Sequence, residues 1–99
     1  MEVIFADDDF DKLEADPNFT LKNMPQGVVK AFRKRMQIIR ASPDERDFYQ
    51  LKSLHFEKLK GNRKHQHSMR LNDQYRLIME LLERSQRKVV KIIGIEDYH

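Results

Sequence analysis

The chain has 99 residues, which is enough for one folded domain with a modest core and too few for two. Its 39% hydrophobic and 35% charged residues exclude a disordered polypeptide, and the absence of cysteine excludes disulfides and thiolate metal sites. Apolar runs reach only four residues and the first residues are acidic, so neither a membrane span nor a secretory signal is expected. We therefore expect a single cytoplasmic domain over residues 1–99 that has no membrane partner.

The net charge of +3 hides a division along the chain. Residues 1–20 contain seven acids and one lysine, a net charge of −6, whereas residues 21–99 contain eighteen Lys and Arg against nine acids, a net charge of +9. A body this basic attracts polyanions, and nucleic acid is the commonest such partner. The alternative is a well-charged soluble surface, which charge alone does not distinguish.

The N-terminal half is predicted to form a strand and two helices. Residues 1–5 alternate weakly, as in a short strand, and residues 7–15 have apolar residues at helical spacing after acids that suit a helix N-terminus. Apolar residues at three- and four-residue steps predict an amphipathic helix over 25–41, with a basic face that contains Lys30, Arg33, Lys34 and Arg40. That face is interpreted either as a solvated surface or as a contact surface for RNA, DNA or an acidic partner.

The C-terminal half is predicted to form a three-stranded antiparallel meander after a polar connector at residues 44–54. A three-residue loop at 72–74 pairs Leu71 with Tyr75, which places the apolar residues of both strands on one face. Residues 83–88 are interpreted as a polar turn, and residues 89–95 as an interior strand with apolar residues on both faces. The predicted fold class is therefore α+β.

Two places concentrate side chains that could perform chemistry. Residues 58–67 contain four basic side chains and two histidines around a single glycine, and such a loop can set cations against consecutive phosphates. The segment Asp97-Tyr98-His99 supplies an acid, a phenol and an imidazole, of which the imidazole titrates near neutrality. The pair His65 and His67 lacks a fixed carboxylate or thiolate partner, so we expect no metal site and no cofactor.

Three separated motifs resemble the HigB-like killer proteins of bacterial toxin–antitoxin modules, within the RelE superfamily. They are residues 59–63, residues 68–76 and residues 97–99. The resemblance covers the C-terminal half closely and the N-terminal half in layout only. It implies a RelE-like α+β toxin that enters the ribosomal A site, contacts mRNA and rRNA, and cuts the mRNA without a metal. It also implies a HigA-like helix-turn-helix antitoxin as partner.

The resemblance assigns roles residue by residue. Lys60 and Arg76 match phosphate-contacting cations, and Asp97, Tyr98 and His99 match a terminal catalytic group. His99 is the candidate for proton transfer, Lys60 and Arg76 for charge stabilisation, Asp97 for orienting the site and Tyr98 for stacking or a hydrogen bond. Further RNA-binding residues are expected at Lys58, Arg63, Lys64 and Arg70.

The chain departs from the family pattern in three places. It has His65 and His67 where the family usually has a glycine and an aromatic residue, and its turn at residues 83–88 is longer and more basic than is common. Some relatives have a histidine shortly before the Lys-Gly pair, where this chain has Glu57, with His55 two residues earlier. No role is assigned to His55.

The leading hypothesis is a ribosome-dependent mRNA endonuclease, and the alternative is a degenerate toxin that binds RNA or docks on an antitoxin without catalysis.

Overall fold

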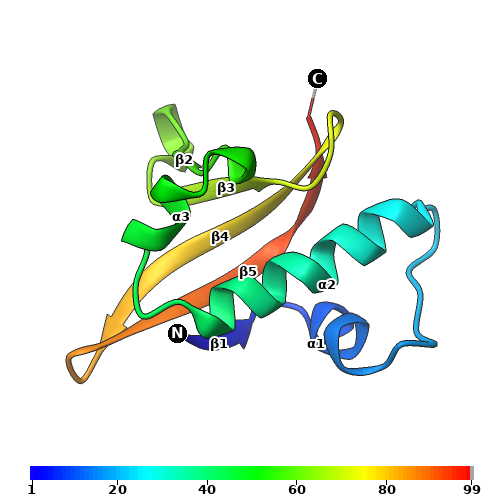
Figure 1. Cartoon of the computed structure of the whole chain (residues 1–99), viewed down its shortest axis with the longest axis horizontal. Coiled ribbons are helices and arrows are strands. Elements are labelled where there is room, and N and C mark those ends of the chain that lie inside the picture. Colours follow the sequence, from blue (N-terminus) through cyan, green and yellow to red (C-terminus); the bar gives the residue numbers. More distant parts are fainter. Residues whose placement is uncertain (99) are drawn as a thin grey trace.

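A five-stranded sheet with helices packed on one face forms the protein, and the computed structural model describes residues 1–98 (Figure 1). The sheet is mixed, because β1 runs parallel to its neighbour and the remaining strands pair in antiparallel fashion. In chain order the elements, with η for 3-10 helices, are β1 (Glu2–Phe5), α1 (Asp8–Ala15), α2 (Gln26–Ala41), α3 (Arg46–Gln50), η1 (Lys52–Leu54), β2 (Glu57–Lys58), η2 (Gly61–Arg63), β3 (Gln66–Arg70), β4 (Tyr75–Arg84) and β5 (Arg87–Asp97).

The strand order β1-β5-β4-β3-β2 places the long β5 inside the sheet. The interior strand predicted for residues 89–95 is therefore confirmed, and so is the α+β class. The N-terminal strand is also confirmed, and it pairs with β5 through Glu2 and Val89. β1 and β5 are far apart in the sequence, and the long connection between them allows their parallel pairing.

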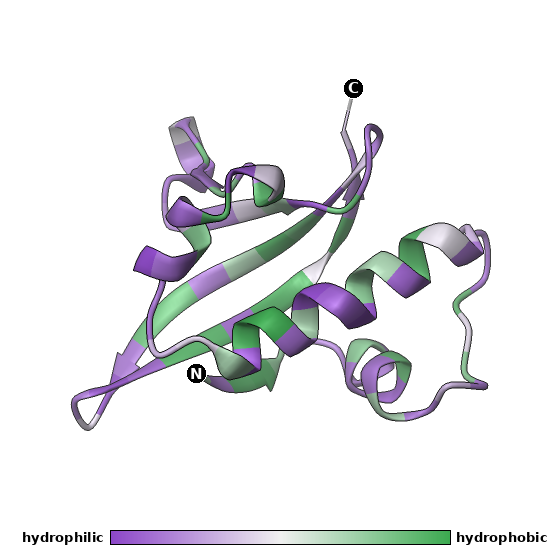
Figure 2. Ribbon diagram, viewed as in Figure 1, coloured by the Kyte–Doolittle hydropathy of each residue, from purple (hydrophilic) through white to green (hydrophobic). Residues whose placement is uncertain are grey.

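The core lies between the sheet and the three α-helices. Buried residues of α2 pack with those of β4 and β5, and α1, α3 and η1 each add one fully or almost fully buried apolar residue: Leu13, Phe48 and Leu54. Figure 2 shows the hydrophobic segments of α2 next to those of the neighbouring strands. The four positions predicted for the apolar side of α2 are all buried: Val29, Phe32, Met36 and Ile39. The buried face of α2 predicted from its apolar periodicity is therefore confirmed.

The acidic start of the chain is accounted for by helix capping. The side chain of Asp7 accepts a hydrogen bond of 2.9 Å from the backbone N–H of Asp9, and further acids occupy the first turn of α1. Negative charge at this position is stabilised by the unpaired N–H groups of the first turn and by the helix dipole. The helical interpretation of residues 7–15 is confirmed.

The hairpin between β3 and β4 has the predicted register. Leu71 donates its backbone N–H to the carbonyl of Tyr75 at 3.0 Å, and Arg70 lies opposite Arg76. The side chain of Asn72 accepts hydrogen bonds from the backbone N–H groups of Gln74 and Tyr75, both at 2.8 Å. An Asx-type turn therefore fixes the loop, and Arg70 and Arg76 lie side by side on the face away from the helices.

Two predictions for the C-terminal half were too simple. The polar connector contains α3 and η1, because Phe48 and Leu54 are buried in the core although their spacing is too short to show a helical period. The polar turn at residues 83–88 is shorter than predicted, since β4 and β5 pair as far as Arg84 and Arg87. Ser85 and Gln86 make the turn, both with positive φ, as tight two-residue hairpin loops require. The meander is also joined by the edge strand β2, which pairs with β3.

Candidate functional site

A basic pocket of about 440 Å³ lies where β2, η2 and the end of β5 meet. Three of its residues are cations, one is a carboxylate and one is an aromatic residue. The lining residues are Glu57, Lys58, Leu59, Lys60, Arg63 and Tyr98. The structure therefore brings four of the predicted site residues into one concave surface, Lys58, Lys60, Arg63 and Tyr98, although 34 or more positions of sequence separate Tyr98 from the others. We call this surface the terminal pocket.

Tyr98 is tied to the neighbouring hairpin through its backbone. Its N–H donates to the carbonyl of Gln74 at 2.5 Å, while its side chain stays 38% exposed. The guanidinium carbon of Arg76 lies 5.2 Å from the centre of the Tyr98 ring, within the range of a cation–π contact. This arrangement places an exposed aromatic ring beside a strand-borne cation at the edge of the terminal pocket.

Arg76 is also held by a backbone carbonyl. Its guanidinium donates a hydrogen bond of 3.1 Å to the carbonyl oxygen of His55, which follows η1. His55 adopts a left-handed conformation with φ of 46°, which is uncommon outside glycine and turns the chain from η1 towards β2. The turn at His55 therefore positions Arg76, a link for which the sequence offered no signal, since it depends on a carbonyl group.

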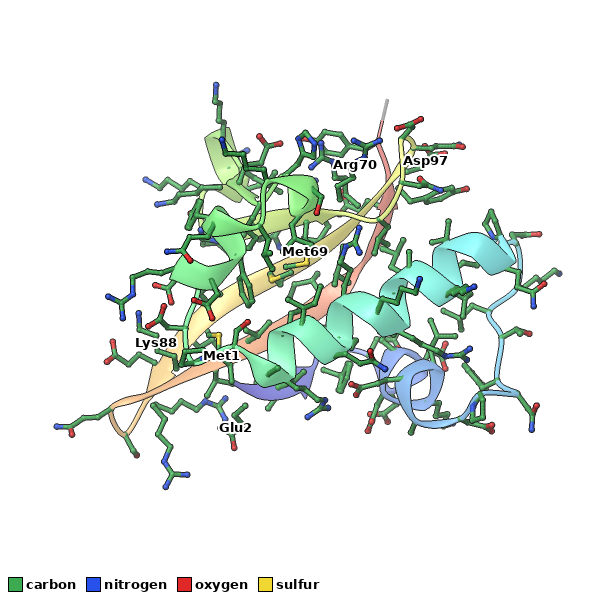
Figure 3. All side chains as sticks on the ribbon, viewed as in Figure 1. Met1, Glu2, Met69, Arg70, Lys88 and Asp97 are labelled. Carbon is green, nitrogen blue, oxygen red and sulfur yellow. The ribbon has the colours of Figure 1, made fainter. Side chains whose placement is uncertain are left out.

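Arg70 has neighbours of its own on the adjacent strand. It forms an ion pair with Asp73, and its guanidinium lies 3.4 Å from the His55 ring nitrogen Nε2. Its backbone carbonyl accepts a hydrogen bond of 2.9 Å from Arg35 of α2. Burial and the nearby Arg70 charge lower the pKa of Arg35. Figure 3 shows Arg70 and Asp97 at the same end of the molecule.

Arg63 is engaged in the most extensive ion pair of the terminal pocket. Its guanidinium donates two hydrogen bonds to the carboxylate of Glu96, at 2.8 and 2.6 Å, and a third to the side-chain oxygen of Gln66 at 3.0 Å. The bond to Glu96 raises the pKa of Arg63. Residues 59–65, which connect β2 to β3, are here called the Lys60 loop. Because Arg63 lies in this loop and Glu96 is near the end of β5, the pair joins the Lys60 loop to the segment that carries Tyr98.

The remaining predicted residues lie around the pocket or beyond the described chain. Asp97 accepts a hydrogen bond of 3.1 Å from the side chain of Gln74. Lys64 is exposed at the end of η2 and is not among the lining residues. Lys60 comes directly before η2 and is exposed. His99, the residue predicted to transfer protons, lies outside the described residues.

Glu57 is a site residue that sequence reasoning left without a role. It lies on the edge strand β2, is exposed and lines the terminal pocket with three cations. The sequence offered one indication, since Glu57 occupies the position where some relatives have a histidine. Its place on an edge strand was not predictable, because the two-residue β2 is too short to show alternation. A carboxylate in this position can accept a proton, which the cations alone cannot do.

The pair His65 and His67 does not form a shared site. His67 stacks on Phe56 with ring centres 5.0 Å apart, and burial and the charge of Lys58 lower its pKa. His65 is exposed and lies 3.8 Å from a carboxylate oxygen of Glu80. Within residues 1–98, no three His, Asp or Glu side chains gather closely enough to hold a metal ion. None of the helices in that range is long and apolar enough to cross a membrane.

The terminal pocket has the elements needed to bind a phosphodiester. Lys58 and Lys60 offer positive charge, and no carboxylate in the described chain lies within ion-pair distance of either. Arg76 is fixed by a carbonyl and a ring, so it is preorganised for an anion. Tyr98 offers an exposed face on which a base can stack. These features fit a single-stranded nucleic acid better than a duplex, whose bases are already stacked.

Comparisons with known proteins identify the family. Residues 4–99 match the model for the RelE-like toxin HigB of type II toxin–antitoxin systems. The fold is similar to a YoeB/ParE toxin from Agrobacterium tumefaciens, with 14% identity, a TM-score of 0.58 and both chains fully covered. It is also similar to two structures from Staphylococcus aureus, and in each case the match covers all of this chain and 97% of the other. They are a YoeB–YefM complex, with 20% identity and a TM-score of 0.58, and a YoeB dimer, with 19% and 0.53. No curated protein matches the chain by sequence.

Proposed function

Because the chain belongs to the HigB-like family of RelE-like toxins from type II toxin–antitoxin systems, we propose that it is an mRNA endonuclease that acts on the ribosome. The substrate is mRNA in the A site, where rRNA also faces the toxin. The observation that supports this proposal most directly is the terminal pocket, in which three cations, one carboxylate and an exposed tyrosine line one concave surface. A metal is not required, since RNA carries its own nucleophile.

The reaction is attack of a 2′-hydroxyl oxygen on the adjacent phosphorus. The new P–O bond forms a cyclic phosphate, and the bond to the 5′-oxygen of the next nucleotide breaks. The 2′-hydroxyl loses its proton to a base, and the leaving 5′-oxygen receives one from an acid. An enzyme that performs this reaction must align the nucleophile, stabilise the additional negative charge on the phosphorane and move these two protons.

Residues of the terminal pocket, together with Arg76, Asp97 and His99, fit these tasks. Lys60 and Arg76 stabilise the charge on the phosphorane, and Tyr98 stacks on a base. Glu57 is the carboxylate of the pocket and accepts the proton of the 2′-hydroxyl, while His99 protonates the leaving oxygen. Asp97, which accepts a hydrogen bond from Gln74, orients the C-terminal segment that follows β5.

The four expected RNA-binding residues divide into two kinds. Lys58 and Lys64 are exposed cations that form no ion pair with a described carboxylate, so they suit direct phosphate contact. Arg63 and Arg70 already bind carboxylates, of Glu96 and Asp73. Arg63 and Arg70 therefore contribute positive potential, and each must exchange its carboxylate before it contacts a phosphate.

Primer extension on mRNA that is being translated tests the catalytic proposal. The native protein is expected to produce discrete cuts, and His99→Ala and Glu57→Gln are each expected to lower the cutting rate by about 10²–10⁴-fold, the usual contribution of general acid–base catalysis. Lys12→Ala, on the exposed side of α1, serves as the matched control and should cut normally. Full cutting by both site variants would refute the assigned roles.

The same experiment decides the alternative of a degenerate toxin. A non-catalytic RNA-binding module would bind RNA with an affinity that falls steeply with salt, and would leave mRNA uncut even with ribosomes present. The observation that favours this alternative is that Arg63 and Arg70 both form ion pairs with carboxylates. These ion pairs reduce the number of cations that are free to bind phosphate.

An antitoxin is the proposed protein partner. One similar structure is a YoeB–YefM complex, and the family belongs to type II toxin–antitoxin systems. We expect a HigA-like helix-turn-helix protein, encoded beside the gene for this chain, and a cytoplasmic location, where translating ribosomes are found. Co-expression of the adjacent open reading frame should relieve growth arrest caused by the toxin, and persistence of the arrest would contradict this partner.

A further inference from the structure

A second concave surface, about 880 Å³ in volume, lies between α2 and the segment that joins α1 to α2. Figure 1 shows the elements that frame it, the N-terminal part of α2 and the connecting segment 16–25, on the right side of the molecule. We call it the α2 groove. It is lined by Pro17, Thr20, Leu21, Met24, Gln26, Gly27, Val29, Lys30, Arg33, Lys34 and Gln37. None of these residues belongs to the terminal pocket.

Arg33 holds the connecting segment against α2 and so builds one wall of this groove. Its guanidinium donates hydrogen bonds to three backbone carbonyls, those of Leu13 at 2.9 Å, Asp16 at 3.0 Å and Phe19 at 3.2 Å. Charged donors bound to several carbonyls fix a loop more firmly than its own turns do. The groove is therefore a formed feature of the fold and not a gap beside a loose loop.

The α2 groove has a uniform sign of charge. Three of its lining residues are cations, Lys30, Arg33 and Lys34, and within the described chain none of the lining residues is acidic. Lys30 and Lys34 are exposed, and neither lies within ion-pair distance of a described carboxylate. Arg33 is occupied by its hydrogen bonds to the connecting segment, whereas these two lysines are available to bind a partner.

The polar residues of the groove form one line along α2. Gly27, Lys30, Lys34 and Gln37 follow one another at steps of three and four residues, which places them on one side of the helix. From Gly27 to Gln37 the helix rises by about 15 Å, the length of about three helical turns or of about five residues of extended chain. The apolar side of the groove, with Leu21 and Met24, runs beside this line.

These properties select the chemical class of the occupant. A groove this long and open, with an apolar wall and a basic rim, matches a polypeptide segment that has apolar residues on one side and acids on the other. RNA fits it poorly, because no aromatic residue is among the described lining residues on which a base could stack. We propose that the α2 groove binds an acidic amphipathic segment of the antitoxin. This inference rests on the proposed function only for the identity of that partner.

Gly27 allows the groove to be filled without disturbing the fold. A Cβ atom built at this position meets no atom within 4 Å, and no unusual backbone angle is required there. Gly27→Trp should therefore fold and occupy the groove with its ring, whereas Gly27→Ala, the matched control, adds one methyl group and leaves the groove open. Circular dichroism and thermal unfolding of both variants establish that each is folded.

The first experiment uses a chemically defined probe. A synthetic amphipathic helix, with leucines along one side and glutamates along the other, is titrated into the isotope-labelled protein and followed by NMR. We expect shifts at Gly27, Lys30 and Lys34, and an affinity at least about tenfold weaker for Gly27→Trp than for Gly27→Ala, as when an apolar anchor is excluded from its pocket. Shifts confined to Lys58, Lys60 and Tyr98, or equal binding of a lysine-substituted probe, would overturn the proposal.

Charge reversal tests the basic rim separately. The double variant Lys30→Glu, Lys34→Glu should weaken probe binding at least about tenfold at low salt and less at high salt. The matched control Arg84→Glu, Arg87→Glu changes net charge equally at the β4–β5 turn, at the opposite end of the molecule in Figure 1, and should bind like the native protein. Equal weakening by the two pairs would show that net charge alone acts, and would refute a specific groove.

The second experiment replaces the probe with the antitoxin encoded next to this chain. Gly27→Trp should stay toxic but require more antitoxin for rescue, whereas Gly27→Ala should be rescued as the native toxin is. Equal rescue of both would refute the groove and leave the proposed function intact. A native protein that is not toxic but still binds the probe in the groove would refute the proposed function alone. A dimer that forms without antitoxin and dissociates in Gly27→Trp would show that a second copy, through its acidic α1, is the occupant instead.

Discussion

The two basic surfaces differ in what surrounds their cations. In the terminal pocket, Lys58 and Lys60 share the space with the carboxylate of Glu57 and with an exposed aromatic ring. In the α2 groove, Lys30 and Lys34 stand beside apolar side chains, with neither an acid nor an aromatic residue among the described lining residues. Positive charge attracts a polyanion to both, but the neighbours of that charge decide whether the surface suits a phosphodiester or an acidic polypeptide.

The largest expected effect separates the two surfaces by activity. Arg76→Ala should lower the rate of mRNA cleavage by about 10²–10³-fold, the usual loss when a preorganised charge partner is removed. Its guanidinium is bound by one carbonyl and one ring at the surface, so the free energy of unfolding should change little. The double variant Lys30→Glu, Lys34→Glu should cut at nearly the native rate in the same primer-extension assay. If both variants lost activity equally, the distinction between the surfaces would fail.

A medium effect is expected from the ion pair that closes the terminal pocket. Arg63→Glu should slow cleavage by about tenfold to a hundredfold, because the Lys60 loop is then released from the segment that bears Tyr98. The side chains of Arg63 and Glu96 are 42% and 39% exposed, so the free energy of unfolding should fall by no more than about 1 kcal/mol.

The exchanged double variant Arg63→Glu, Glu96→Arg provides the control for that prediction. It restores the pair with its charges reversed and should recover most of the cleavage rate if the pair acts by positioning. A double variant as slow as Arg63→Glu alone would instead indicate that Arg63 contacts phosphate directly, the role that the family resemblance implies.

The smallest effect concerns His67, which lies behind the terminal pocket on β3. Burial lowers the pKa of His67 below its ordinary value, so the unfolded chain binds this proton more readily than the folded one. The stability that the neutral ring contributes is thus present above the unfolded pKa of about 6.5 and is lost as the pH falls below it.

Urea unfolding of matched variants at several pH values tests this sign. The free energy of unfolding of the native protein should decline on acidification by less than about 1 kcal/mol on account of His67, because the ring is only partly buried. His67→Gln should flatten the decline, whereas His65→Gln, on an exposed ring, should leave it unchanged. An equal decline in native protein and His67→Gln would rule out this ring as its source.

Much of the fold was predictable wherever a repeating pattern extended over many residues. The sixteen-residue α2 shows several turns of apolar spacing, and the register between Leu71 and Tyr75 follows from alternation on both sides of one loop. The elements that were missed are the five-residue α3 and the two-residue β2, which are shorter than the pattern needed to recognise them. Their positions depend on burial of Phe48 in a core built by distant strands.

Most residues that the structure gathers in and beside the terminal pocket were named from the sequence, but their geometry was not predictable. Lys60, Arg76 and Tyr98 were selected by their resemblance to a family, and the pocket contains or adjoins all three. The pairing of Arg63 with Glu96 was not predicted, since it joins residues from two separate segments by side-chain contact. The hydrogen bond from Arg76 to the backbone carbonyl of His55 was not predicted either. Every residue has a backbone carbonyl, so the sequence does not indicate which one a side chain will bind.

The parallel pairing of β1 with β5 has a consequence for how the protein is made. Residues Glu2–Phe5 are synthesised long before their partners Val89–Ile92. Such a long-range contact forms only after its loop has closed, which is slow and cannot begin while β5 is still inside the ribosome. The sheet therefore closes after β5 has left the exit tunnel, and the segment with Tyr98 becomes fixed only then. The edge of the terminal pocket that Tyr98 forms is therefore completed only after synthesis of β5.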